Sequence, residues 1–136
     1  MRIVMMAVLG LAPLAPASAA EISGVVTHVE DGDTFSVGVT AIRLCGIDAP
    51  ESRAPGGDDS FAALYRMIRG RQVRCLPVGE GTPCDGRSQR MNRGRVVAQC
   101  FLEGADIAAA MVRAGFACDW PRYSGGAYGP LGCTRR

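Results

Sequence analysis

The chain has 136 residues, of which 48% are hydrophobic and 21% are charged, and its formal net charge is +2. This length suits one hydrophobic core, and the near-neutral charge argues against a protein that coats nucleic acid without specificity. All 15 basic residues are arginines, whose guanidinium forks bind phosphates and carboxylates bidentately, although a GC-rich genome would give the same bias.

Residues 1–20 have the pattern of a secretory signal peptide. Arg2 precedes a short apolar run that ends in small residues. The run is too short for a comfortable membrane span of about 20 residues, although an uncleaved membrane anchor is the alternative. We expect cleavage after Ala19 or Ala20, a secreted or periplasmic location, and one domain over residues 21–136 without stable membrane association.

Apolar periodicity predicts the elements that follow the signal peptide. β-Rich segments separated by tight turns predict strands over 22–29, 34–39 and 41–47. Apolar residues at i, i+3, i+4 and i+7 then predict a helix over 58–70, with its N-cap at Asp58, Asp59 or Ser60. The remaining chain predicts a strand at 71–76, a polar loop at 77–93, a strand at 94–102, a helix at 105–115 and an irregular tail at 116–136.

The order β-β-β-α-β-β-α indicates an α+β fold. It is typical of a five-stranded OB-type Greek-key β-barrel with two helices packed on it. Barrels of this type commonly bind nucleic acids or sugars on one face.

Two carboxylates are expected to meet at one end of the 34–39/41–47 hairpin. Asp33 directly precedes the first strand and Asp48 directly follows the second. Neighbouring carboxylates repel unless a cation or a proton lies between them, and calcium tolerates an irregular shell of oxygen ligands. Pro50 favours an extended Ala49, whose carbonyl could join that shell. The alternative is a solvated pair of turn aspartates.

Arg43 lies within an apolar strand. Side chains alternate between the faces of a strand, so Ile42 and Leu44 can face the core while Arg43 points the other way. A single arginine on the outer face of a sheet requires no function. Its position beside two carboxylates makes it a candidate for a functional site.

Three segments resemble the staphylococcal-nuclease-like, or thermonuclease, family. They are VVTHVEDGDTFSV (25–37), IRLCGIDAPE (42–51) and GRVVAQC (94–100). The resemblance extends from about Ile22 to Ala117 and implies an OB-type barrel that cleaves DNA and RNA with calcium (Ca²⁺) as cofactor. Family members usually continue into a third, charged helix, which we expect to be short or missing here.

The resemblance also implies roles for single residues. The matching positions are the calcium ligands Asp33, Asp48 and the carbonyl of Ala49, the general base Glu51, and the phosphate-binding arginines Arg43 and Arg95. Asp31 lies in the motif and is expected to be structural. Arg87 offers a rival position for the second arginine, but the strand that follows Arg95 favours Arg95.

Two further residues are expected to contact nucleotides. Arg93 stands where family members often have an aromatic residue. Tyr123 is the preferred base-stacking residue among the aromatic side chains of the tail, where packing of the tail is an equal alternative.

The residue types suit hydrolysis of a phosphodiester, whose anionic oxygens repel a nucleophile. A calcium ion and two guanidinium groups would neutralise that charge in the transition state. Glu51 could deprotonate a water that attacks phosphorus in line, which would leave a 3′-phosphate. We expect a monomeric endonuclease with DNA and RNA as substrates, single strands preferred. The alternatives are a catalytically silent OB-fold module that binds nucleic acid or protein, and a disulfide-rich structural or inhibitor domain.

The six cysteines all follow the predicted signal peptide, and an even number in a small exported domain indicates disulfides. A barrel of this type can pair the two strands that each carry one cysteine, and a second pair brackets the tail. The expected disulfides are Cys75–Cys100, Cys118–Cys133 and, as the remaining pair, Cys45–Cys84. The alternative for Cys45 is a small buried hydrophobic residue.

Overall fold

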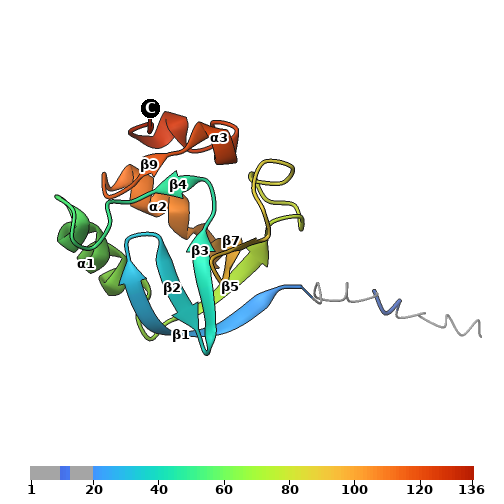
Figure 1. Cartoon of the computed structure of the whole chain (residues 1–136). Helices are drawn as coiled ribbons and strands as arrows, with labels where there is room; N and C mark the ends of the chain where they lie inside the picture. The colour runs from blue at the N-terminus through green and yellow to red at the C-terminus, as the bar shows by residue number, and fades with distance from the viewer. Residues whose placement is uncertain (1–9, 13–19) are drawn as a thin grey trace, which may run out of the picture.

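Five strands of the computed structural model form a closed barrel (Figure 1). In the order in which neighbours pair around the barrel, they are β1 (Ile22–Asp31), β2 (Thr34–Val37), β3 (Thr40–Leu44), β7 (Arg95–Leu102) and β5 (Gln72–Pro77). The parallel pairing of β3 with β7 closes the barrel, and the other four pairings are antiparallel. The OB-type α+β fold expected from the sequence is therefore confirmed.

The structure describes residues 10–12 and 20–136. Most of the predicted signal peptide, including the residue before the first expected cleavage site, lies outside the described residues. Within the described part, no helix is long and apolar enough to cross a membrane.

Two helices pack on the barrel. α1 (Gly57–Ile68) buries Leu64 and Ile68, and α2 (Ile107–Arg113) buries Met111 and other apolar residues. The expected N-cap of α1 is wrong. The cap is Gly56, whose φ of 81° suits glycine, and no side chain caps the helix.

α2 is shorter than the predicted helix over 105–115. Residues Ala105–Asp106 form the short strand β8, which pairs with the end of β7 instead of joining the helix. The side chain of Asp106 then caps α2 by accepting a hydrogen bond from the Ala109 N–H at 3.2 Å. Ala114 follows α2 as its C-cap, so the helix stops before Gly115.

The loop and the tail contain short elements that the sequence did not predict. β6 (Met91–Asn92) in the loop pairs with β7. The strand predicted over 41–47 is interrupted, since β3 ends at Leu44 and the chain resumes as β4 (Ile47–Asp48), which pairs with β9 (Cys118–Asp119) in the tail. The tail also holds α3 (Pro121–Ser124) and the 3₁₀ turn η1 (Gly129–Leu131). The third helix is therefore short, and the tail lies beside β4 at one end of the barrel, in red in Figure 1.

All six cysteines form disulfides, and the pairs are those expected from the sequence: Cys45–Cys84, Cys75–Cys100 and Cys118–Cys133. The second bridge joins directly opposed residues of β5 and β7 inside the barrel. The first ties the long loop to the end of β3, and the third closes the tail. Disulfides of this number fit an oxidising environment.

Asp85 organises the loop between β5 and β6. Its carboxylate accepts hydrogen bonds from the Thr82 hydroxyl (2.7 Å) and from the N–H groups of Gly79 (2.6 Å) and Gly81 (2.8 Å). These bonds, that of Thr82 first, lower the pKa of Asp85 to about 2. The charged carboxylate therefore stabilises the folded loop above the ordinary pKa of aspartate, and this contribution is lost as the pH falls toward 2.

We predict that Asp85→Asn lowers the free energy of unfolding by about 1 kcal/mol at pH 6, because hydrogen bonds to a charged but solvent-accessible acceptor are lost. The difference in the free energy of unfolding between wild type and Asp85→Asn should narrow between pH 4 and pH 2, where the wild-type carboxylate becomes protonated. Urea unfolding at pH 6, 4 and 2.5 measures it. A difference that stays constant over this range would contradict the assigned role of the charge.

Candidate active site

The turn between β1 and β2 fixes the carboxylate of Asp33. Asp33 is only 5% exposed, and its Oδ2 accepts a hydrogen bond from the Ala49 N–H at 3.0 Å. Gly32 permits this arrangement, because a Cβ there would lie 2.7 Å from the Cβ of Ser60 and 2.8 Å from the Cβ of Ala49. The glycine of the DGDT segment thus allows the turn to pack against both α1 and the exit of β4.

Asp48 ends β4 and is more accessible than Asp33, with its side chain 33% exposed. Its Oδ1 lies 3.9 Å from Nη2 of Arg43, and its Oδ2 lies 3.3 Å from Nε of Arg135. A cavity of about 230 Å³, lined also by Pro50 and Phe116, opens beside it. Solvent and small ions can therefore reach this carboxylate.

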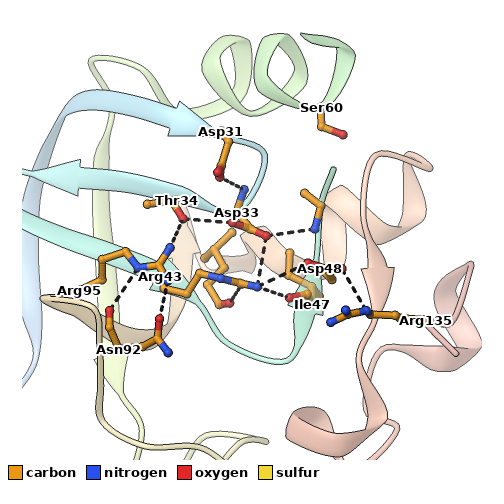
Figure 2. A network of polar contacts seen from close by, with 12 residues as sticks. Asp31, Asp33, Thr34, Arg43, Ile47, Asp48, Ser60, Asn92, Arg95 and Arg135 are labelled. Atoms are coloured by element: carbon orange, nitrogen blue, oxygen red, sulfur yellow. Dashed lines mark hydrogen bonds and ion pairs between the residues drawn. The ribbon is translucent and has the colours of Figure 1, made fainter. Parts of the chain in front are cut away.

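Arg43 connects the two carboxylates, as Figure 2 shows. The same nitrogen, Nη2, lies 3.2 Å from Oδ2 of Asp33 and 3.9 Å from Oδ1 of Asp48. Nη2 also donates to the Ile47 carbonyl at 2.9 Å, and Nη1 donates to the Leu44 carbonyl. The guanidinium group thus occupies the place where the sequence predicted a cation, while Ile42 and Leu44 are fully buried on the other face.

Arg95 is linked to Asp33 through the hydroxyl of Thr34. Nη1 of Arg95 donates to Oγ1 of Thr34 at 3.2 Å, and Oγ1 donates to Oδ1 of Asp33 at 3.0 Å. Nε and Nη2 of Arg95 donate to the carbonyl and side-chain oxygens of Asn92. Because β3 and β7 are parallel neighbours, Arg43 and Arg95 belong to one polar network (Figure 2).

Glu51 is exposed and lies in the loop that follows β4. The start of α1 packs tightly on this loop, because a Cβ at Gly57 would lie 1.9 Å from the Glu51 carbonyl oxygen. The pKa of Asp31, which lies in the same region, is raised to about 7. Burial is the largest cause, followed by the hydrogen bond and negative charge of Asp33 and then by the charge of Glu51. The Asp31 carboxylate also accepts a hydrogen bond from the Asp33 N–H, a structural contact.

The network does not include the two expected nucleotide contacts or the rival arginine. Arg93 sits at the tip of the β6–β7 turn with a φ of 51°. Tyr123 belongs to α3 and packs edge-to-face on Trp120, with ring centroids 4.8 Å apart. Arg87 lies against Gly125 in the tail, where its Nε would be 2.7 Å from an added Cβ. This placement leaves Arg95 as the arginine that joins Arg43.

Three residues of the network were not found from the sequence: Thr34, Asn92 and Arg135. Thr34 follows Asp33 directly, and Asn92 precedes the Arg93–Gly94 turn, so both had a local signal. Arg135 had only an indirect one, since Cys133 lies two residues before it and pairs with Cys118.

The residues present fit a hard divalent cation. Asp33 and Asp48 direct carboxylate oxygens toward one guanidinium nitrogen, so the position between them favours positive charge. Carboxylate and carbonyl oxygens are the ligands that calcium prefers, and Ala49 adds a carbonyl between Asp48 and Pro50. Among the described residues, no group of three or more His, Cys, Asp or Glu side chains gathers at a metal-binding distance. Backbone oxygen and water would therefore have to complete the shell.

A family model described as staphylococcal nuclease homologue matches residues 41–127, more than half of the chain. The chain belongs to the staphylococcal nuclease homologue family. An Escherichia coli protein named "Uncharacterized endonuclease" is 32% identical over 114 residues, which cover 80% of this chain and 68% of that protein. The rice "Probable staphylococcal-like nuclease CAN1" is 32% identical over 79 residues, 58% of this chain and 20% of that protein. The family identification made from the motifs is confirmed.

We predict that Arg43→Ala lowers the free energy of unfolding by about 3 kcal/mol without added metal, because it leaves the buried carboxylate of Asp33 without its ion-pair partner. Arg43→Lys should lower the free energy of unfolding less, since lysine keeps the positive charge but lacks the two-pronged guanidinium group. Urea unfolding in a chelating buffer measures both. Arg53→Ala, which removes an exposed arginine, is the control, and an equal loss in that variant would contradict the assigned pairing.

Proposed function

We propose that this chain is an exported, calcium-dependent endonuclease that hydrolyses phosphodiester bonds in single-stranded DNA and RNA to 3′-phosphate products. The observation that carries the proposal is the convergence of Asp33 and Asp48 on Arg43, with Arg95 joined to the same network through Thr34. This arrangement supports the proposal because it occurs in a member of the staphylococcal nuclease homologue family.

In the proposed site, Asp33, Asp48 and the carbonyl of Ala49 would hold calcium. When bound, calcium would supply positive charge that offsets the charge developing on the phosphate. The N–H of Ala49 keeps Asp33 oriented, and Asp48 faces the cavity through which an ion and a substrate can enter.

Arg43 and Arg95 are the proposed phosphate ligands. Arg43 would donate hydrogen bonds to the non-bridging oxygens of the phosphate, in place of its pairing with the two carboxylates. Arg95, which is partly buried, would bind the same group from the neighbouring strand, and Asn92 and Thr34 hold its guanidinium in place. Guanidinium forks match the geometry of phosphate oxygens and stabilise charge that grows in the transition state.

Glu51 is the proposed general base. Its exposed carboxylate would accept a proton from the water that attacks phosphorus, and the 5′ oxygen would leave on the opposite side. Arg93 and Tyr123 are proposed to contact flanking nucleotides, Tyr123 by stacking. Three disulfides support the proposed export, and the proposed working form is a monomer.

We predict that the purified protein cleaves denatured DNA and RNA in calcium and not in a chelator. Glu51→Gln should lower kcat by about 10²–10⁴-fold, because it removes the base while preserving the size and shape of the side chain. Gel assays of end-labelled strands measure the rate and identify the 3′-phosphate.

Glu30→Gln is the matched control, since it makes the same chemical change at an exposed carboxylate outside the network. Full activity in the chelator, or equal rates for Glu51→Gln and wild type, would contradict the proposed mechanism. Tight binding of nucleic acid by the wild type without any cleavage would identify the protein as a silent OB-fold binding module instead.

A further inference from the structure

Arg135 brings a third guanidinium group to the site. Its Nε lies 3.3 Å from Oδ2 of Asp48, on the far side of that carboxylate from Arg43 (Figure 2). Its guanidinium carbon lies 3.6 Å from the ring centroid of Trp120, which is within the range of a cation–π contact. Arg135 is thus held on two sides, by a charge and by an aromatic ring.

The backbone of the tail fixes this position. The N–H of Arg135 donates to the Asp119 carbonyl at 2.7 Å, and the N–H of Asp119 donates to the Cys133 carbonyl at 2.9 Å. Thr134 therefore runs parallel to Asp119 as an isolated β-bridge. β9 pairs with β4, which carries Asp48, and the Cys118–Cys133 disulfide closes the loop between residues 118 and 133. These two constraints place Arg135 next to Asp48.

The guanidinium group of Arg135 keeps donors that can bind an anion. Arg43 lies closer to Asp33 (3.2 Å) than to Asp48 (3.9 Å), and Arg135 contacts Asp48 through Nε alone, at 3.3 Å. The two terminal nitrogens of Arg135 have no hydrogen-bonding or ion-pairing partner in the described part of the chain, and its side chain is 41% exposed. A fork held on an aromatic ring with unused donors is a suitable ligand for phosphate.

We propose that Arg135 is a further substrate-binding residue, which contacts a backbone phosphate next to the one that is cleaved. The proposal rests on the nuclease function proposed above. The pairing with Asp48 places the guanidinium beside the candidate metal ligand, and the contact with the Trp120 ring restricts its position, so little side-chain freedom is lost when a strand binds.

Binding of single-stranded DNA tests the proposal without cleavage. The parent is Glu51→Gln, measured by fluorescence anisotropy in calcium at several salt concentrations. Adding Arg135→Ala should weaken binding about tenfold at low salt and reduce the slope of log Kd against log salt by about 0.7, as expected for one phosphate contact on a single strand. The slope is the decisive readout, because loss of a merely structural contact would not change it.

Arg136→Ala is the matched control, because it removes the same charge one residue further along the chain. It should change affinity by less than twofold. The double variant Cys118→Ser/Cys133→Ser, which keeps Arg135 but releases the tail, should reproduce the loss in affinity and slope. Circular dichroism of each variant verifies that the barrel remains folded.

The outcomes separate this proposal from the function on which it rests. Unchanged affinity and slope for Arg135→Ala, or an equal loss for Arg136→Ala, would overturn the role of Arg135 alone. A parent that binds no nucleic acid would overturn both proposals.

Discussion

The site depends on the guanidinium group of Arg43, which lies between the carboxylates of Asp33 and Asp48. Asp33 is buried, and a buried charge without a partner destabilises a fold strongly. Arg43 also binds two backbone carbonyls that follow it, so one side chain ties the end of β3 to the entry and exit of the hairpin. The residues proposed for catalysis are therefore also residues on which the local fold depends.

The closed barrel explains how residues distant in sequence reach this place. β3 and β7 are parallel neighbours, which brings Arg95 to the strand that carries Arg43. β4 leaves the barrel and pairs with β9, which brings the tail and Arg135 to Asp48. Cations and carboxylates then alternate through the network from Arg95 to Arg135, with Thr34 as the single neutral link between Arg95 and Asp33. This alternation keeps each carboxylate near positive charge.

The sequence predicted the parts of this arrangement that follow from local rules. Alternation within a strand placed Arg43 opposite Ile42 and Leu44, and hairpin geometry placed Asp33 and Asp48 at one end. The order of strands and helices was sufficient for the barrel type. The predicted N-cap of α1 was wrong because the loop after Glu51 packs tightly against the start of the helix, where Gly56 is the cap and Gly57 the first residue. The predicted start of α2 was wrong because Ala105 pairs with β7 as part of a strand and does not join the helix.

Arg135 could not be predicted, because its position depends on non-local contacts. A strand pairing, an isolated bridge and a disulfide must all form before its side chain meets Asp48. None of these leaves a periodic pattern near residue 135. The pairing of the cysteines was predictable, but the direction in which the side chain of Arg135 would point after the disulfide closes the tail was not.

A crystal structure of the protein grown in calcium tests the central claim most directly. The account predicts one calcium ion about 2.3–2.6 Å from carboxylate oxygens of both Asp33 and Asp48 and from the carbonyl of Ala49. Arg43 should then have released at least one of the two carboxylates. An ion bound elsewhere, with Asp33 and Asp48 still paired to Arg43 at saturating calcium, would contradict the account.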